Sequence, residues 1–154
     1  MPRMDWMALS KMKLGAYGEY FAKMELTSYG LDVYTSEVDD KGIDFVCLKG
    51  KRLLKIQVKS IQTATEYVFM KKKHFDICDD DLYLCLLLFE QGKMPETYLI
   101  PASAWKKATP LLRNYSYAAG QKSEPEYGLN LSQKNKSLLA EFRIEQTLKG
   151  ILDK

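Results

Sequence analysis

Asp44, Gln57 and Lys59 are the residues of this sequence whose types and spacing could do chemistry together. Gly50-Lys51 has the composition of a two-residue hairpin turn with glycine first, and that turn sets Asp44 opposite Gln57. Side chains two apart on a strand share a face, so Lys59 joins them. One end of the hairpin then presents a carboxylate, an amide oxygen and an ammonium group side by side.

The residues between these polar positions are apolar. Leu54, Ile56 and Val58 alternate with them and are expected to face a core, which explains why polar side chains are tolerated on the other face. The alternation does not explain which polar residues stand there. An ordinary half-exposed hairpin, on which Asp44 and Lys59 form an ion pair, fits the same pattern.

Asp44 followed by Gln57-x-Lys59, with Glu19 on a preceding helix, resembles the PD-(D/E)XK nuclease superfamily in its Gln variant. Within that superfamily the chain is most similar to the small homing endonucleases of cyanobacterial group I introns. The similarity spans Leu14 to Trp105 and rests on Asp44 and three stretches: Gly15 to Glu19, Leu53 to Ser60 and Thr97 to Pro101.

The resemblance implies an α/β fold of the restriction-endonuclease type, with a mixed β-sheet flanked by helices. It also implies a Mg²⁺-dependent endodeoxyribonuclease, homing- or restriction-endonuclease-like, with Glu19, Asp44, Gln57 and Lys59 as catalytic residues. The ion, for which Mn²⁺ could substitute, would be held by Asp44, Gln57, the carbonyl of Val58 and Glu19, all hard oxygen donors. Lys59 would orient the attacking water and offset negative charge.

The sequence departs from the superfamily pattern at two positions. Gln57 replaces the commoner Glu, and Ile43 stands where the motif has its proline. Losing a negative charge lowers affinity for a divalent cation unless another acid compensates. Helical geometry places Glu25 near the centre of the apolar stripe and Glu19 at its edge, and the resemblance favours Glu19 as the compensating acid.

Two other functions remain open at this stage. One is a catalytically inactive module of the same fold that binds nucleic acid or a protein partner, and the other is an interaction protein without a nucleic-acid role. The net charge of +3 is compatible with nucleic-acid binding without indicating it. Lys71-Lys72-Lys73 fits a solvated turn as well as a phosphate contact.

DNA is favoured over RNA, and a homo-oligomer would let so small a chain cut both strands of a duplex.

The bulk composition predicts a single domain over residues 1–154, since 154 residues with 46% hydrophobic content bury one core and leave no room for a second full domain. The N-terminus lacks the pattern of an export signal, and the longest apolar run has eight residues, so we expect a cytoplasmic protein that does not span a membrane. Three cysteines, an odd number, favour a reducing compartment. His74 has no Cys or His partner at ligand spacing, so zinc is not expected.

The elements that must position these residues follow from periodicity. An amphipathic helix is expected between Leu9 and Tyr29, and a strand buried on both faces at Leu82 to Phe89. We predict a loop over Leu111 to Glu126 and a closing helix after Ser132 with Leu138, Leu139, Phe142 and Leu148 on its apolar side, giving a sheet with a helix on each face. The other predicted elements are strands at Leu31 to Ser36, Ile43 to Leu48, Leu53 to Ile61, Glu66 to Met70, Thr97 to Ile100 and Tyr127 to Leu131, and a short helix from Ser103 to Lys107.

Overall fold

A computed structural model describes residues 1–37, 42–117, 120 and 122–153. Its larger sheet has the strand order β1-β2-β3-β5-β6, in which β3 and β5 run parallel and the other neighbours antiparallel. These strands are β1 (Asp32–Tyr34), β2 (Phe45–Lys49), β3 (Arg52–Gln62), β5 (Leu82–Phe89) and β6 (Glu96–Pro101). A smaller antiparallel sheet has the order β4-β8-β7, with β4 (Tyr67–Lys71), β7 (Leu112–Tyr115) and β8 (Glu126–Asn130).

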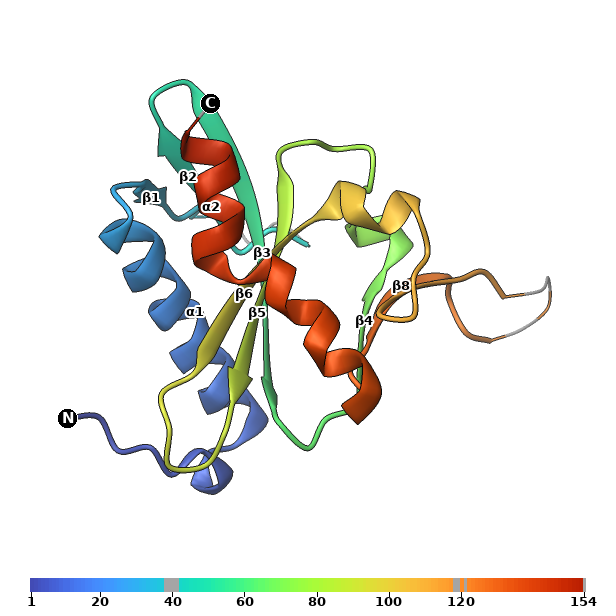
Figure 1. The fold of residues 1–154 in the computed structure, drawn as a ribbon, viewed down its shortest axis with the longest axis horizontal. Helices are drawn as coiled ribbons and strands as arrows, with labels where there is room; N and C mark the ends of the chain where they lie inside the picture. The colour runs from blue at the N-terminus through green and yellow to red at the C-terminus, as the bar shows by residue number, and fades with distance from the viewer. Residues whose placement is uncertain (38–41, 118–119, 121, 154) are drawn as a thin grey trace.

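The two α-helices pack on the same face of the larger sheet. Residues of α1 (Lys11–Ser28) and α2 (Ile144–Leu152) share one core with that face, while the smaller sheet and the 3-10 segments η3 (Ala102–Lys106) and η4 (Gln133–Phe142) share a second core with the other. Figure 1 shows α1 and α2 on one side of the molecule and β4 with β8 on the other. The predicted mixed sheet flanked by helices is confirmed: both α-helices cover one face, and only 3-10 segments lie with the smaller sheet on the other. No helix in the described part of the chain has both the length and the apolar character to cross a bilayer.

Strand β5 lies between the two cores. All eight of its residues are buried, as the unbroken apolar run predicted. Tyr83, Cys85, Leu87 and Phe89 face the helices, and the alternate leucines face the smaller sheet. Because the strand has no polar face, it must sit in the middle of the sheet, where it aligns β3 through their parallel ladder.

Helix α1 is capped at both ends. The Ser10 hydroxyl accepts a hydrogen bond from the backbone N–H of Lys13 at 3.2 Å. Gly30, with φ of +85°, follows the last turn and has the left-handed conformation that ends many helices. Gly18 lies so close to β3 that an added Cβ would come 1.8 Å from Ser60 Oγ. A glycine here therefore permits the close packing of α1 against β3.

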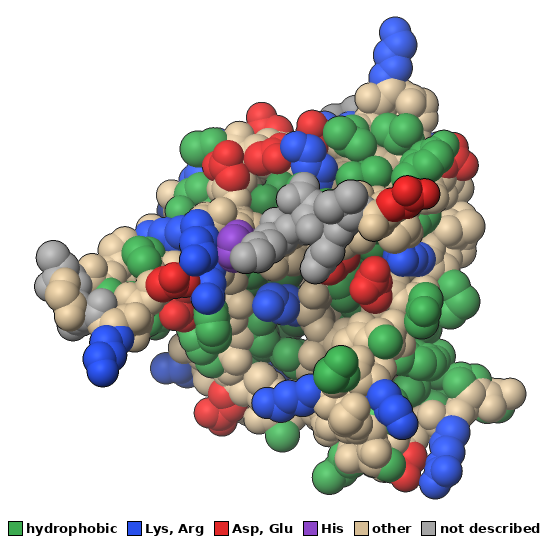
Figure 2. Space-filling view, turned by 180° about the vertical axis from the view of Figure 1, so that it is seen from behind, with side chains coloured by type: hydrophobic (Ala, Val, Ile, Leu, Met, Phe, Trp, Pro, Cys, Tyr) green, Lys and Arg blue, Asp and Glu red, His purple; other side chains and the backbone are tan. Residues whose placement is uncertain are grey.

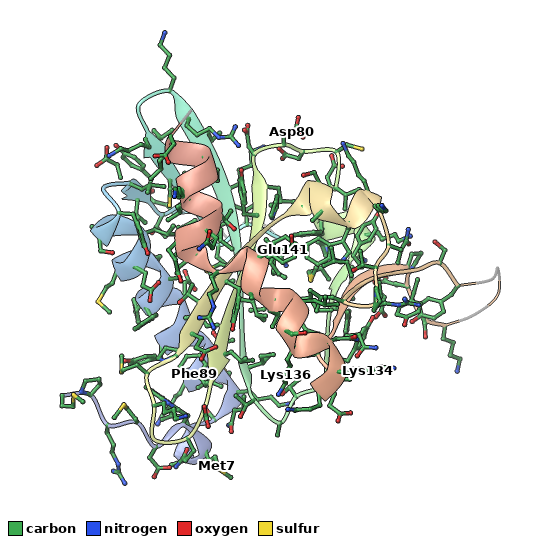
Figure 3. All side chains as sticks on the ribbon, in the orientation of Figure 1. Met7, Asp80, Phe89, Lys134, Lys136 and Glu141 are labelled. Atoms are coloured by element: carbon green, nitrogen blue, oxygen red, sulfur yellow. The ribbon has the colours of Figure 1, made fainter. Side chains whose placement is uncertain are left out.

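Two predictions for the C-terminal part of the chain were wrong. The expected loop contains strand β7, which pairs with β8; residues 118, 119 and 121 of that stretch lie outside the described residues. The expected closing helix is divided at Arg143 into η4 and α2, and Leu138 is exposed. Figure 3 shows Lys134 and Lys136 at one end of η4 and Glu141 near its other end. The cause of the division is a tertiary contact, because the extended backbone of Arg143 bridges Tyr98 of β6.

We predict opposite effects for one substitution at two sites on α1. Gly15→Ala should raise the free energy of unfolding by up to about 1 kcal/mol, because Ala favours the helix and nothing lies within 4 Å of the added Cβ. Gly18→Ala should lower it, since overpacking costs about 1–3 kcal/mol and exceeds the helix gain. Urea unfolding of both variants measures the difference. Equal stabilisation by the two substitutions would show that α1 does not pack closely on Ser60.

Candidate active site

The hairpin of β2 and β3 has the predicted register. Its ladder runs from the pair Lys49 and Arg52 beside the turn to the pair Phe45 and Ile56, and Gly50 has φ of +59°, as a turn with glycine first requires. Asp44 comes one residue beyond the last pair. Its backbone N–H donates to the Ile56 carbonyl at 2.8 Å, so the hairpin continues to the residue that carries the carboxylate.

The Asp44 carboxylate turns to the backbone of β3. Its Oδ2 accepts a hydrogen bond from the N–H of Val58 at 2.6 Å. The predicted proximity of Asp44 to the Gln57-x-Lys59 segment is thus found, although it is fixed through Val58 and lies outside the regular ladder. A carboxylate held by a backbone N–H has a defined orientation, which a site that binds a cation needs.

Gln57 and Lys59 occupy the half of β3 that β2 no longer covers. In the ladder with β5 they lie beside Leu84 and Leu86, which belong to the second core, so both side chains leave the sheet on the face opposite α1. The Gln57 Oε1 is buried and has no hydrogen-bond partner in the described part of the chain. Within the same residues Lys59 Nζ makes no ion pair. The amide oxygen of Gln57 and the ammonium group of Lys59 therefore do not stabilise the fold through a hydrogen bond or an ion pair of this kind among the described residues.

These groups fit a hard divalent cation. No three His, Cys, Asp or Glu side chains gather at a potential metal site in the residues that the structure describes. A cation at the hairpin would therefore depend on amide and backbone oxygens beside the carboxylates. The buried Oε1 of Gln57 is such an oxygen, and leaving it without a partner is costly unless a ligand occupies it. The Asp44 carboxylate, bound to the next residue along β3, supplies the negative charge.

Glu19 lies on α1, on the other side of the hairpin from Gln57. Its carboxylate forms an ion pair with Lys23 at 3.3 Å, and the Lys23 Nζ lies 5.5 Å from the ring centroid of Phe45. Because Phe45 follows Asp44 directly, this ion pair sits at the level of the start of β2. The structure thus brings Asp44, Gln57, Val58 and Lys59 together on the hairpin, whereas Glu19 lies on the helix that covers the opposite face of the sheet and pairs with Lys23.

Glu25, the other acid weighed for this role, lies in a different place. It lines a hollow with Thr97, Arg143 and Glu145, between α1 and the start of α2. Burial raises the pKa of Glu25 above its usual range, and the nearby Glu145 carboxylate raises it further. The polar groups around this carboxyl come from α1, β6 and the start of α2, and none of them belongs to the hairpin that carries Gln57.

A groove of about 660 Å³ begins at Lys59 and runs between the N-terminal end of α1, the open edge of β3 and β4. Figure 2 shows the face opposite α2, which is hollowed near its middle and carries both basic and acidic side chains near the hollow. The groove is lined by Leu9, Lys11, Leu14, Lys59 to Gln62, Ala64, Thr65 and Tyr67 to Phe69.

Three residues of the groove were not predicted as site residues from the sequence: Lys11, Tyr67 and Phe69. A signal for the two aromatic residues was present, because they alternate with Val68 and Met70 on a predicted strand, and Val68 and Met70 are the buried pair. Alternation shows that Tyr67 and Phe69 share an outer face, but it does not show that this face borders Lys59.

The side chains of the basic triplet Lys71 to Lys73, which starts at the last residue of β4, form ion pairs and hydrogen bonds within the protein. Lys71 and Lys73 both form ion pairs with Glu124 at 3.0 Å, which hold the pKa of that carboxyl below its usual range. Lys72 donates to the Ser116 hydroxyl at 2.8 Å. The three lysines tie the segment after β4 to the connection between β7 and β8, which favours a structural role over a phosphate contact.

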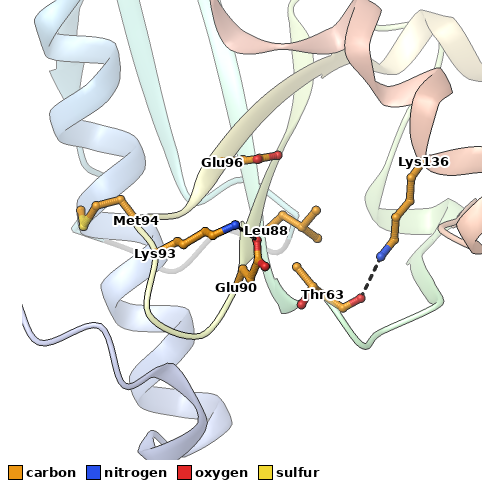
Figure 4. A pocket seen from close by; sticks show the side chains of 7 residues that line it. All are labelled: Thr63, Leu88, Glu90, Lys93, Met94, Glu96 and Lys136. Carbon is orange, nitrogen blue, oxygen red and sulfur yellow. Dashed lines mark hydrogen bonds and ion pairs between the residues drawn. The ribbon is translucent and has the colours of Figure 1, made fainter.

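A second hollow of about 270 Å³ lies where β3 and β5 end and β6 begins. Figure 4 shows Lys136 bonded to the Thr63 carbonyl there, at 3.0 Å, and Glu90, Lys93 and Glu96 nearby. Lys93 pairs with Glu90 at 3.1 Å. Most polar groups of this hollow form hydrogen bonds or ion pairs with one another. None of the predicted site residues lines the hollow.

The mixed sheet with α1 packed on it is an α/β fold like that of the PD-(D/E)XK-type nucleases. It is similar to the Holliday junction resolvase Hjc of Archaeoglobus fulgidus, with 13% identity and a TM-score of 0.54 over 86% of this chain and 93% of the other. It is also similar to the bacterial homing endonuclease I-Ssp6803I, with 19% identity and a TM-score of 0.52 over 94% of this chain and 92% of the other. No protein-family model and no curated protein matches the sequence. The predicted resemblance is confirmed at the level of the fold.

The raised pKa of Glu25 leads to a prediction about how stability depends on pH. The folded state holds the Glu25 proton more tightly than the unfolded state, so ionisation of this group opposes folding as the pH rises through its raised pKa. Glu25→Gln should therefore stabilise the protein at neutral pH, with a difference from wild type that shrinks in acid. Thermal unfolding across that pH range measures this. Nuclease activity lost with Glu25→Gln but kept with Glu19→Gln would reverse the assignment of the helix acid.

Proposed function

We propose that this protein is a Mg²⁺-dependent endonuclease that hydrolyses phosphodiester bonds in DNA. The observation that carries the proposal is the hairpin arrangement itself. The Asp44 carboxylate is bound to the Val58 N–H, between a buried amide oxygen of Gln57 that has no partner and a lysine, Lys59, that forms no ion pair among the described residues. The nuclease character of the two structural neighbours supports it.

Mg²⁺ would be held by the Asp44 carboxylate, the Gln57 side-chain oxygen and the carbonyl of Val58, with Glu19 holding a water or a second ion. Mn²⁺, which also accepts oxygen ligands, could take its place. The bound cation would polarise the scissile phosphate and lower the pKa of a water molecule. This donor set is poor in negative charge, so we expect weaker cation binding than at sites with several carboxylates.

The protein's own groups have separate tasks in this proposal. The Val58 N–H orients the Asp44 carboxylate, at 2.6 Å. Lys59 orients the attacking water and offsets the negative charge that develops on the phosphate, which a fixed ammonium does without reorganising during the reaction. Lys59 pairs with Leu86 of β5 in the parallel ladder, so its side chain leaves the sheet on the face opposite α1.

DNA is the proposed partner because the two neighbours are described as a Holliday junction resolvase and a homing endonuclease. A site of this size acts on one strand at a time, so a symmetric dimer would supply the second site needed to cut a duplex through both strands.

The test is cleavage of plasmid DNA and of branched DNA, with Mg²⁺, with Mn²⁺ and with a chelator. We predict that the wild-type protein cuts when either ion is present and that Lys59→Ala lowers the rate by about 10²-fold or more, as expected for loss of a charge-stabilising group. Lys51→Ala is the matched control, because Lys51 lies exposed in the turn of the same hairpin. Absence of cleavage under all conditions would refute the proposal in favour of an inactive nuclease-fold module.

Cation binding separates the roles of the two acids from that of the lysine. Asp44→Asn should lose Mg²⁺ binding and cleavage, because only neutral oxygens then remain on the hairpin, while its amide oxygen can still accept from Val58. Lys59→Ala should keep Mg²⁺ binding, since an ammonium does not ligate a cation. Glu19→Gln should fall between wild type and Asp44→Asn if Glu19 holds a water, and should match Asp44→Asn if it is a direct ligand. Calorimetry with Mg²⁺ and Mn²⁺ gives the affinities; unchanged binding by Asp44→Asn would refute the metal site.

A further inference from the structure

The groove that begins at Lys59 has an aromatic wall. Tyr67 and Phe69, on the outer face of β4, are 38% and 45% exposed. Their rings are nearly parallel, with centroids 6.4 Å apart and an angle of 20° between their planes. The fold does not need these rings for its core, because Val68 and Met70 of the same strand fill that role. Two large apolar rings are thus presented to a groove that contains a proposed catalytic residue.

The orientation of the Tyr67 ring is fixed from three sides. The ring lies over Gly128 of β8, where an added Cβ would come 2.5 Å from a ring carbon. Its hydroxyl donates a hydrogen bond to Glu126, and Tyr115 meets it edge-on, with centroids 6.2 Å apart. Burial and the Glu126 carboxylate raise the pKa of Tyr67, so the ring stays neutral. A ring that is already ordered loses little entropy when a ligand stacks beside it.

The charged side chains that line the groove are of one sign, and two carboxylates near the aromatic wall, those of Glu124 and Glu126, lie outside that lining. Lys11 and Lys59 are the charged side chains among its lining residues, which include no carboxylate. A phosphate-bearing strand complements two ammonium groups, and the adjacent aromatic rings offer flat faces to bases. Bases inside an intact duplex are stacked on one another and cannot offer a face to a protein ring unless they leave the stack.

We propose that this groove binds an unpaired nucleotide of a DNA strand, with the base stacked on Phe69 and Tyr67 and the phosphates near Lys59 and Lys11. The inference rests on the proposed function and deepens it, because it assigns the enzyme a substrate class: DNA with unpaired nucleotides beside the cleavage site. Phe69 determines this specificity by contact with the base, and Tyr67 supports it from the next position on the strand face.

The test compares two DNA ligands of equal length, a continuous duplex and a duplex with an unpaired single-stranded arm, by fluorescence anisotropy without divalent cations. The wild-type protein should bind the second more tightly. Phe69→Ala should weaken its binding by about 5- to 150-fold, the range expected for loss of base stacking, and should change binding of the continuous duplex less than about twofold. Phe69→Trp, which keeps a stacking ring, should restore the preference.

The matched control is Tyr29→Ala, which removes an aromatic ring of similar exposure, 37%, at the far end of α1. It should leave both affinities unchanged, and thermal unfolding checks that each variant is folded. Equal wild-type affinity for the two DNA ligands overturns the inference, and so does an equal loss of affinity for both with Phe69→Ala. The inference is also overturned if a peptide binds in the groove and changes the affinity for neither DNA ligand. Because binding is measured without cleavage, a Phe69-dependent preference in a protein that cuts nothing overturns only the proposed function.

Discussion

The hydrogen bond between the Val58 N–H and the Asp44 carboxylate joins β2 to β3 at the point where their regular ladder stops. Up to Phe45 and Ile56 the strands are held by backbone pairing, and beyond that pair β3 continues beside β5 alone. The Asp44 carboxylate therefore accepts a hydrogen bond that the backbone of a neighbouring strand would otherwise accept from β3. It does so at the point where β3 becomes an open edge. Both the candidate active site and the groove beside it depend on this early end of the β2–β3 pairing.

The open edge of β3 can exist because β5 supports that strand from the other side. Strand β5 is buried on both faces and pairs with β3 up to Gln62 and Phe89. Burial of apolar side chains in the two cores fixes β5, and the pairing with β5 keeps β3 extended although one edge of β3 borders a groove. The close approach of α1 at Gly18 packs that helix against the face of β3 opposite to Gln57 and Lys59.

Several charged groups away from the candidate site form ion pairs, and the buried side-chain oxygens without a hydrogen-bond partner in the described residues are those of Gln57, Ser60, Thr97 and Ser132. Lys71 and Lys73 pair with Glu124, Lys55 with Asp79, and Arg52 with Asp81. The amide oxygen of Gln57 is buried without a partner in the described residues. Burial of an unsatisfied acceptor lowers stability; the Gln57 oxygen differs from the three hydroxyl oxygens in lying next to a carboxylate bound to the same strand, which is the arrangement that a cation site uses.

The sequence by itself determined the local elements and the hairpin. Period-two alternation and a glycine-first turn predicted the pairing of β2 with β3, the unbroken apolar run predicted that β5 is central, and the periodicity between Leu9 and Tyr29 predicted α1. These features depend on neighbouring residues, so local patterns carry them. The resemblance added Glu19 and the class of fold, which periodicity alone could not supply.

Only the tertiary structure decided which distant segments meet. The bridge between Arg143 and Tyr98 divides the expected closing helix, and the pairing of β7 with β8 turns an expected loop into a strand. Both helices cover one face because the smaller sheet occupies the other. In the same way Tyr67 and Phe69 reach the groove at Lys59 only through the packing of β4 across the open edge of β3. Contacts between residues far apart in the chain follow from the packing of whole layers, and no short pattern in the sequence records them.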